Sequence, residues 1–362
     1  MMLYIYYGNM NKESLIGVKK KILAQSRTFM KEFGKACYTI YAGQTIYFMQ
    51  ENTVIDKKYA ATKKMCNEAV MHWLSIYDVK AVYIRYTFSD VWLIDLLKEL
   101  KSKKIRMIME FPTVPYDGED GIIRPIEDKY YREQLHKYIN CCTTYANYEA
   151  VFGIPCIPLV NGVNVDEHKL KNRNQEKEDI TLLAVATMRR EHGYERIIEG
   201  LYHYYCAGGN RKVYFRLAGD GPQVQYYKRL VKEYELEKYV TFYGFIQGND
   251  LDKAYDDADI GIGALGLYKS GISAGVGIKA AEYCVRGLPM VMTDTYGFEN
   301  RYYVYTVSND SKPVNIDEMI AFYHGLQHRD YSLDMRRYVA ENYSWDEVLK
   351  PVIKYLKEGD IS

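Results

Sequence analysis

Residues Gly275 to Val291 read GVGIKAAEYCVRGLPMV, and their pattern is the clearest indication of the fold. An apolar run, DIGIGAL at 259–265, and a loop rich in Gly and Ser precede them. The central part has apolar residues at helical spacing. Gly287 is typical of a residue that follows a helix, and Pro289 stands where the helix has ended. The order strand, small-residue loop, helix, strand predicts one unit of a parallel α/β sheet.

A loop of this kind offers free backbone N–H groups and the positive end of a helix dipole to an anion. Lys279 lies in the first helical turn, where a cation opposes the dipole unless a phosphate is bound. Glu282 lies one turn further on the same face and can accept paired hydrogen bonds from a ribose diol. The pattern therefore predicts a nucleotide diphosphate site, and the alternative is a surface ion pair. The small residues of the loop are Ser270, Gly271, Ser273, Ala274, Gly275 and Gly277.

The rest of the chain continues the alternation of strands and helices, which predicts two successive doubly wound α/β domains. A polar segment at 168–179 without apolar periodicity is the best candidate for a boundary. We expect an N-terminal domain over 1–172, a C-terminal domain over 173–335 and a helical tail over 336–362 that packs back on the first domain. Expected strands lie at 1–7, 37–43, 45–50, 80–86, 105–111, 141–146, 155–160, 180–187, 212–219, 240–245, 259–265 and 288–294, and expected helices at 17–36, 59–78, 90–104, 127–140, 193–208, 223–236 and 250–258.

Composition limits the class of protein. The chain has 362 residues, 48% of them hydrophobic, and a formal net charge of +1, which is globular and gives no basis for binding nucleic acid. No apolar run is long enough to span a membrane, and the N-terminus lacks the pattern of a signal peptide. The cysteines form no CxxC pair, which argues against a zinc site or disulfides and for a reducing, cytoplasmic compartment. They are Cys37, Cys66, Cys141, Cys142, Cys156, Cys206 and Cys284.

Several segments, in order along nearly the whole chain, resemble the retaining GT-B glycosyltransferases of family 4, also called glycosyl transferases group 1. The segment at 277–294 is similar to their donor-binding helix, in which a run like K-x-x-E-Y-x-x-x-G-x-P-V recurs. The other segments are GVKKKILAQ (17–25), LVNGVNVD (159–166), LLAVATMRREHGYERIIEGL (182–201), LAGDGP (217–222), VTFYGFIQGNDLDKAYDDADIGI (240–262) and RRYVAENYSWDEV (336–348).

The resemblance implies a GT-B fold, in which two Rossmann-like domains face a central cleft. It implies a retaining, metal-independent hexosyltransferase that moves sugar from a UDP- or GDP-sugar to a glycan or lipid-linked acceptor, in bacterial capsule, exopolysaccharide or other surface polysaccharide synthesis. No cofactor and no metal are expected. The donor-binding residues it indicates are Gly17, Val18, Thr187, Arg189, Arg190, His192, Gly219, Phe245, Ile246, Ser273, Gly275, Val276, Gly277, Ile278, Lys279 and Glu282.

The chain departs from the family pattern at three positions. The first signature Glu is replaced by Ala274, and an Arg and a Lys that face the diphosphate are replaced by Thr187 and His192. Arg189 and Arg190 lie between the last two and are expected to supply the missing charge. Two alternatives stay open: a nucleotide-sugar epimerase or hydrolase of the same fold, and a non-catalytic donor-binding partner of a transferase.

The first domain is expected to bind the acceptor. Glu110 ends an expected strand, at the edge where α/β sheets place ligands, and is the candidate catalytic carboxylate. The alternative is a carboxylate that caps the next element. Two basic clusters in this domain, Lys19–Lys21 and Lys101–Lys104, predict peripheral contact with an anionic membrane at its inner face. A solvated surface is the alternative for both clusters.

Overall fold

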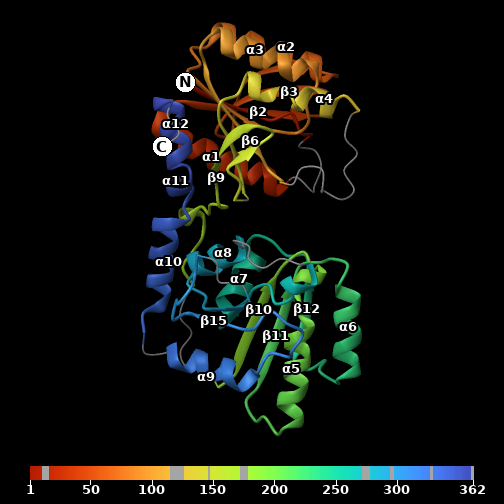
Figure 1. Cartoon of the computed structure of the whole chain (residues 1–362). Helices are drawn as coiled ribbons and strands as arrows, with labels where there is room; N and C mark the ends of the chain where they lie inside the picture. The colour runs from red at the N-terminus through yellow and green to blue at the C-terminus, as the bar shows by residue number, and fades with distance from the viewer. Residues whose placement is uncertain are drawn as a thin grey trace. The chain divides into compact units, whose positions relative to one another are not determined.

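The structure is a computed structural model of the chain and describes residues 1–9, 16–114, 126–145, 147–171, 178–270, 278–293, 297–326 and 329–359 (Figure 1). The chain forms two compact units: unit 1 comprises 1–160 and 345–362, and unit 2 comprises 161–344. We expected residues 161–172 in the first domain and residues 336–344 in the helical tail. Both segments belong to unit 2 instead. The reason is local bonding, since the Val163 N–H donates to the Tyr343 carbonyl (2.8 Å) and Arg336 donates to the Val165 carbonyl (2.8 Å).

Unit 1 is built on a nine-stranded sheet with the order β4-β3-β2-β1-β5-β6-β7-β9-β8. The strands from β2 through β1, β5, β6 and β7 to β9 are parallel, whereas β3 and β4 form an antiparallel extension at one edge and β8 pairs antiparallel with β9. The strands are β1 (Met2–Ile5), β2 (Ala36–Ala42), β3 (Thr45–Gln50), β4 (Thr53–Tyr59), β5 (Ala81–Arg85), β6 (Arg106–Phe111), β7 (Cys142–Thr144), β8 (Ala150–Val151) and β9 (Ile154–Pro158).

Helices cover both faces of this sheet. One core contains residues of α2 (Lys63–Ile76) and α3 (Val91–Ser102), and the core on the other face contains residues of α1 (Ile16–Phe33), α11 (Trp345–Val348) and α12 (Lys350–Glu358). The C-terminal segment is tied to α1, since Asp346 accepts hydrogen bonds from Thr28 (2.6 Å) and Lys31 (2.6 Å). Short helical turns α4 (Asp128–Arg132) and η3 (Leu135–Lys137) follow β6.

Unit 2 has a six-stranded sheet, parallel throughout, with the order β12-β11-β10-β13-β14-β15. One buried core joins this sheet to α5 (Glu195–Cys206), α6 (Val224–Glu233) and α9 (Ile316–Leu326). On the other side α7 (Asn249–Asp257) contacts β10, and α8 (Ile278–Arg286) packs against α10 (Tyr331–Asn342). The strands are β10 (Ile180–Val185), β11 (Val213–Ala218), β12 (Val240–Gly244), β13 (Ile260–Ile262), β14 (Met290–Met292) and β15 (Val304–Thr306).

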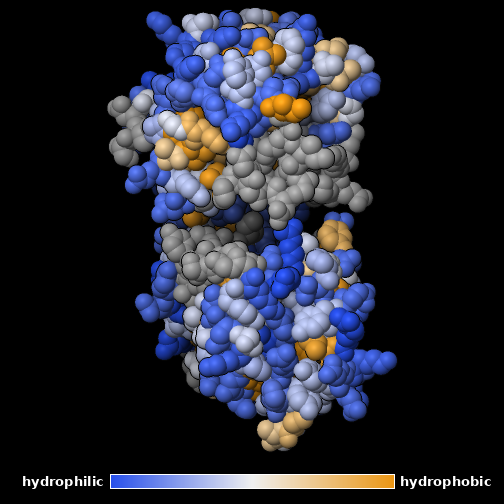
Figure 2. Space-filling model, turned by 45° about the vertical axis from the view of Figure 1, so that its right-hand side comes forward, coloured by the Kyte–Doolittle hydropathy of each residue, from blue (hydrophilic) through white to orange (hydrophobic). Residues whose placement is uncertain are grey.

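The predicted fold class is confirmed, because both units are Rossmann-like domains with parallel sheets. The expected helix at 127–140 was wrong in length, since only the turns α4 and η3 form there. The sequence also gave no indication of β4, β8 or β15. On the face shown in Figure 2, hydrophilic residues cover most of both units and hydrophobic ones form small separate patches. Over the described residues, none of the helices has the length and apolarity that crossing a bilayer requires.

Candidate functional site

The carboxyl ends of the parallel strands of unit 2 meet at one edge of the sheet, and this edge holds the predicted donor site. The loops that leave β10 and β11 are joined there by backbone hydrogen bonds, from Ala186 N–H to the Ala218 carbonyl (3.0 Å) and from Met188 N–H to the Asp220 carbonyl (2.8 Å). Gly219 lies between them at φ +119, and a Cβ there would overlap the Ala186 carbonyl oxygen. Only glycine therefore lets these two loops approach so closely.

A second close approach joins η5 (Arg190–His192) to the turn η6 (Leu267–Ser270) that precedes residues 271–277. Gly193 has φ +60, and a Cβ on it would lie 2.6 Å from the backbone nitrogen of Gly266. The Gly266 N–H donates to the Glu191 carbonyl (3.1 Å), and the Leu265 N–H donates to the His192 carbonyl (2.9 Å). The loop after β10 therefore positions the chain that leads to α8.

His192 has a defined tautomer. Its Nδ1 accepts a hydrogen bond from the backbone N–H of Arg189 (2.9 Å), so the ring proton of the neutral imidazole lies on Nε2. Burial, together with the charges of Lys279 and Arg189, lowers the pKa of His192 to about 3. The ring, which stacks on Tyr194 at 5.5 Å between centroids, is therefore neutral near pH 7 and carries one N–H donor.

Lys279 and Glu282 lie one turn apart on α8, and both are partly exposed. Burial lowers the pKa of Lys279 to about 8, while the nearby carboxylates of Glu282 and Glu191 raise it and Arg189 lowers it further. Glu191 and Arg189 belong to the loop after β10. Because their charges act on Lys279, the start of α8 lies close to that loop. At neutral pH this lysine is an ammonium group beside the neutral His192, a combination that suits an anionic ligand.

The other donor residues predicted in unit 2, apart from Ile246, divide into three groups. Thr187, Arg189 and Arg190 are exposed on the loop after β10, at the same edge of the sheet. Phe245, at the end of β12, is 73% exposed, so its ring is available to a ligand. Ser273, Gly275, Val276 and Gly277 lie outside the described residues, and Ile278 begins α8, where only its backbone is described.

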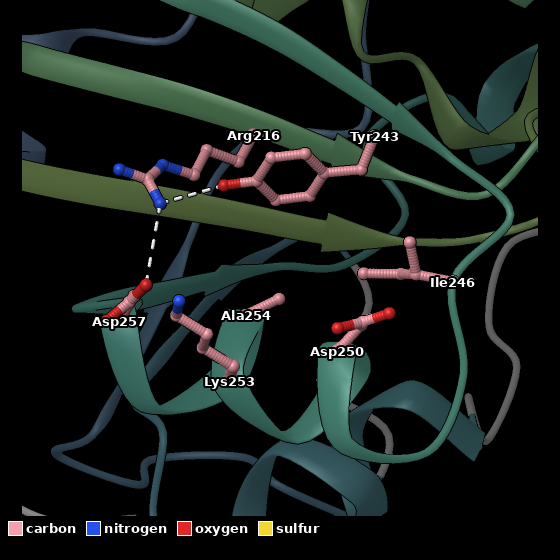
Figure 3. A pocket seen from close by; sticks show the side chains of 7 residues that line it. All are labelled: Arg216, Tyr243, Ile246, Asp250, Lys253, Ala254 and Asp257. Atoms are coloured by element: carbon pink, nitrogen blue, oxygen red, sulfur yellow. Dashed lines mark hydrogen bonds and ion pairs between the residues drawn. The ribbon is translucent and has the colours of Figure 1, made fainter.

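Ile246 lines a pocket of about 360 Å³ between the edge of the sheet and α7 (Figure 3). Arg216 on β11 spans its wall, donating to the Tyr243 hydroxyl (2.7 Å) and lying 3.8 Å from the Asp257 carboxylate. The other residues that line the pocket come from α7; they are Asp250, Lys253 and Ala254. The pocket begins where β12 ends, beside the loop that carries Phe245.

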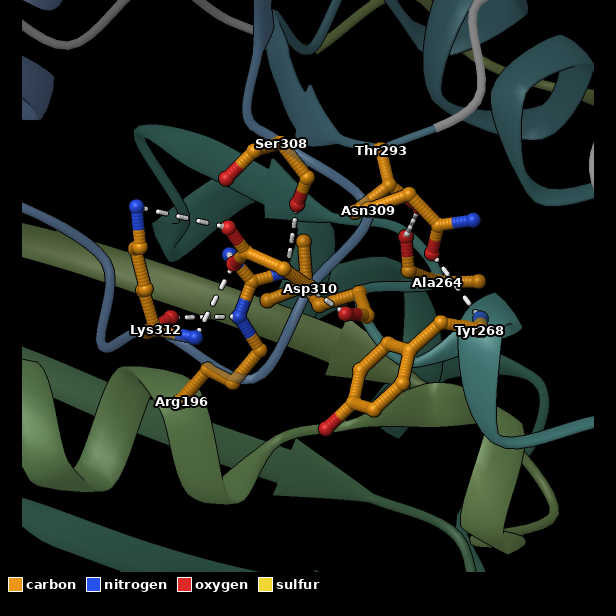
Figure 4. A network of polar contacts seen from close by, with 9 residues as sticks. Arg196, Ala264, Tyr268, Thr293, Ser308, Asn309, Asp310 and Lys312 are labelled. Carbon is orange, nitrogen blue, oxygen red and sulfur yellow. Dashed lines mark hydrogen bonds and ion pairs between the residues drawn. The ribbon is translucent and has the colours of Figure 1, made fainter.

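Arg196 on α5 holds the loops behind the site together (Figure 4). Its guanidinium donates to the carbonyls of Lys312 (2.6 Å), Leu265 (2.7 Å) and Ser308 (2.9 Å), and it lies 3.3 Å from Asp310. Only 2% of the side chain is exposed. This residue thus fixes the chain after β13 against the chain after β15.

In unit 1, Glu110 is completely buried at the end of β6. Its carboxylate accepts hydrogen bonds from Tyr83 (2.5 Å), from Gln25 (3.3 Å) and from Arg85, its partner in register on β5. Lys21 lies 3.9 Å from the same carboxylate. In this conformation Glu110 pairs with the Arg85 guanidinium at the carboxyl edge of the sheet, and its catalytic role stays a prediction.

Lys21 does not belong to a surface cluster, which corrects one element of the membrane prediction. Its ammonium lies over the Tyr145 ring at 3.3 Å, and burial together with the Arg85 charge lowers its pKa to about 6. Lys19 and Lys20 are exposed, as are Gly17 and the lysines of 101–104, whereas Val18 is half-buried. The two basic clusters lie on α1 and at the end of α3, which pack on opposite faces of the sheet. One flat membrane would therefore contact only one of them.

Residues 165–309, which include most of the site in unit 2, match the family described as Glycosyl transferases group 1. An uncharacterized glycosyltransferase of Methanocaldococcus jannaschii is 24% identical over 218 residues, which are 55% of this chain and 53% of that protein. The chain thus spans about half the length of the curated relative it matches.

Solved structures share the fold over almost the whole chain. A glycosyltransferase from Rickettsia africae has a TM-score of 0.66 at 14% identity, and sucrose-phosphate synthase from Thermosynechococcus elongatus has 0.63 at 13%, each with 99% of both chains covered. An Anabaena protein in complex with UDP and glucose has a TM-score of 0.56 at 10% identity, with 99% of both chains covered. The fold of this chain is therefore GT-B.

Sequence reasoning missed several residues of both edges. Arg196 and Glu191 belong to the segment that resembles the family, but no motif marked them. Arg85 offered a usable signal, because it is a charged residue at the end of an apolar strand, as Glu110 is. The order of the strands in the sheet decides which two such residues become neighbours, and a single sequence does not reveal that order.

Proposed function

We propose that this chain is a retaining, metal-independent GT-B glycosyltransferase that moves a hexosyl group from a UDP- or GDP-sugar to a glycan or lipid-linked acceptor. One observation carries the proposal. The His192 Nδ1 accepts a hydrogen bond from the Arg189 backbone N–H (2.9 Å) at the carboxyl edge of the unit 2 sheet, and Lys279 on α8 is close enough for its charge to lower the pKa of His192. This edge lies in the segment that matches the Glycosyl transferases group 1 family.

The chemistry of the leaving group explains why these side chains suit the reaction. Breaking the bond between sugar and phosphate leaves a nucleoside diphosphate with an additional negative charge. Fixed cations and N–H donors lower the energy of that charge as it develops. The Lys279 ammonium, the Arg189 guanidinium and the Nε2–H of His192 are such donors. Glu282, one turn along α8, would accept hydrogen bonds from the ribose hydroxyls.

Two departures from the family pattern find a place in this scheme. His192 replaces a lysine, and as a neutral N–H donor it contributes a hydrogen bond without a charge. Arg189 restores a cation on the same loop. For the donor, the structure of the Anabaena protein with UDP and glucose favours UDP-glucose as the first compound to test.

The test is release of nucleoside diphosphate by the full-length chain from a panel of UDP- and GDP-sugars, with and without glycan acceptors and a metal chelator. We expect release that requires an acceptor, survives the chelator and gives a product with the anomeric configuration of the donor. Release without acceptor would instead indicate a hydrolase, a rearranged sugar nucleotide an epimerase, and tight UDP binding without turnover a non-catalytic partner. Lys279→Ala should lose turnover, whereas Lys212→Ala, an exposed lysine before β11, should not.

We also propose bacterial surface polysaccharide assembly as the setting, at the inner face of the membrane. Lys19 and Lys20 are exposed lysines near the start of α1, the helix that follows β1 at the carboxyl edge of the unit 1 sheet, where an acceptor is expected. Sedimentation with anionic vesicles at low and high salt tests the contact. Replacing Lys19 and Lys20 by Gln should release the protein, and replacing Lys103 and Lys104 should not.

A further inference from the structure

Cys142 and Cys156 lie side by side in the sheet of unit 1. They are partners in register on the adjacent parallel strands β7 and β9. Both side chains are on the same face, since Cys142 belongs to the core under α2 and α3 and Cys156 packs against that core. Neighbouring strands are about 4.8 Å apart, and a disulfide needs Cα atoms about 4.4–6.8 Å apart. Backbone geometry therefore permits a bond between these two residues.

The two thiols differ in character. The neighbouring Cys142 thiol lowers the pKa of Cys156, whereas the neighbouring Cys156 thiol and burial raise the pKa of Cys142. Cys156 is half-buried, whereas Cys142 is completely buried and lies 3.5 Å from the Ile154 carbonyl oxygen. The thiolate therefore forms at the sulfur that a reagent in solution can reach.

We propose that Cys142 and Cys156 are a redox-active dithiol, which a small disulfide such as oxidised glutathione converts into an intramolecular disulfide. The Cys156 thiolate attacks one sulfur of oxidised glutathione, forms a mixed disulfide and releases one glutathione thiolate. The Cys142 thiol, losing its proton, then attacks the Cys156 sulfur and releases the second glutathione. The pair loses two electrons and two protons, and oxidised glutathione becomes two molecules of glutathione.

Two other cysteines provide internal comparisons. Cys141 is the immediate neighbour of Cys142 in sequence, but its side chain lies in the core on the opposite face of the sheet. Cys206 is exposed at the end of α5 in unit 2, so it can take up glutathione. The other cysteine of unit 2, Cys284, lies on α8 and not on a strand beside it. These residues separate the effect of alignment in the sheet from proximity in sequence and from exposure.

The disulfide would act on the strand through which the chain leaves unit 1. β9 ends at Pro158, shortly before unit 2 begins at Asn161. β7 pairs with β6 on its other side, with Cys142 opposite Met109, the neighbour of Glu110. The bond would fix β9 covalently to β7, which pairs with β6, the strand that carries Glu110. This inference does not depend on the proposed function, because it rests on the strand register, the burial and the chemistry of the two thiols.

The experiment uses the reduced full-length protein, treated with oxidised glutathione and then with iodoacetamide to block free thiols. Cleavage after Lys137, Glu149 and Lys169 places Cys142 and Cys156 on different peptides, which mass spectrometry finds joined only if the disulfide has formed. We expect joined peptides for the wild type and for Cys141→Ala, and their loss for Cys142→Ser and Cys156→Ser. Cys142→Ser should accumulate glutathione on Cys156, whereas Cys156→Ser should leave Cys142 as a free thiol.

Three results would overturn the proposal. Joined peptides that vanish in Cys141→Ala would assign the bond to Cys141. Wild-type protein that carries only glutathione adducts would show that the second step does not occur. Equal glutathione uptake at Cys206 and Cys156, without joined peptides, would mean that exposure alone sets the reactivity. If Cys142→Ser does not fold, Cys156→Ser tests the same bond from the less buried side.

Discussion

Replacing Arg196 by Met tests whether one buried guanidinium holds the loops behind the donor site. The side chain would keep most of its length but lose every hydrogen bond to Leu265, Ser308 and Lys312. Bonds from a charged donor contribute about 1.5–3 kcal/mol each. Their sum overstates the effect, because Ser308 and Lys312 lie on an exposed loop whose carbonyls can turn to water. A buried acceptor left without its donor costs about 1–3 kcal/mol. The Leu265 carbonyl should contribute most of the loss, and for the three carbonyls together we expect about 3–4.5 kcal/mol.

The assay can observe the two units separately. The chain has three tryptophans, Trp73, Trp92 and Trp345, and all of them belong to unit 1. Tryptophan fluorescence therefore follows unit 1, whereas far-UV circular dichroism follows both units. With a urea dependence of about 3 kcal/mol per M, Arg196→Met should lower the midpoint of the unit 2 transition by about 1–1.5 M. The fluorescence midpoint should stay in place.

The control is Arg229→Met, which changes an exposed arginine on α6 of the same unit. We expect it to change the free energy of unfolding by no more than about 0.5 kcal/mol. With the same urea dependence, that is a midpoint shift of about 0.2 M at most. If Arg196→Met shifts the dichroism midpoint no further than Arg229→Met does, the three carbonyls find other donors at no cost and the reasoning is wrong. If the fluorescence and dichroism midpoints shift together, the two units unfold as one. In that case the test is whether Arg196→Met lowers the common midpoint further than Arg229→Met does.

Four further predictions concern the two sheet edges. Glu282→Ala should weaken UDP or GDP binding by about 10- to 150-fold in a calorimetric titration, at unchanged melting temperature, because one charge-assisted hydrogen bond contributes about 1.5–3 kcal/mol; an unchanged affinity would mean that Glu282 does not meet the ribose. Nucleotide affinity should fall as pH rises through about 8, where Lys279 loses its proton, and Lys279→Arg should remove that dependence; a flat wild-type profile would contradict it. Gly219→Ala should destabilise unit 2 by more than about 3 kcal/mol in urea unfolding, since the new methyl overlaps the Ala186 carbonyl, whereas a normal midpoint would show that the loop can move aside. Glu110→Gln should lower the free energy of unfolding of unit 1, followed by fluorescence, by about 3–5 kcal/mol, because the buried Arg85 guanidinium loses its counter-ion; a fully stable variant that binds nucleotide normally but has lost turnover would support the predicted catalytic role instead.

How much the sequence could foretell depends on which interactions are local. The alternation of apolar runs and helical periods identified both sheets, and the spacing of Lys279 and Glu282 placed them on one helical face. The loop that carries Arg189 and His192 was assigned to the same site only through resemblance. Its position against α8 depends on which strands are neighbours in the sheet, and a single sequence does not encode strand order in a readable form.

The errors have physical causes as well. β4 reads TVIDKKY and is exposed on both faces as the edge strand of unit 1, so it lacks the alternation that marks a half-buried strand. The sequence predicts one surface cluster from three consecutive lysines, Lys19 to Lys21. Successive helical residues are about 100° apart, so they cannot all face solvent on a helix that packs against a sheet. The third of them turns inward, to Glu110.

The interrupted course of unit 1 has a consequence for synthesis on the ribosome. The contacts between Thr28 and Asp346 and between Glu32 and Lys357 close loops of more than 300 residues, as the separations of 318 and 325 show. Translation completes unit 2 before α11 and α12 emerge, since domains generally fold as units during synthesis. Until then, α1 and the sheet face beneath it wait without Leu349, Val352 and Leu356, which are buried in the finished protein. A chain truncated after residue 344 would therefore present a complete unit 2 and an uncovered apolar surface on unit 1, the kind of surface that chaperones bind.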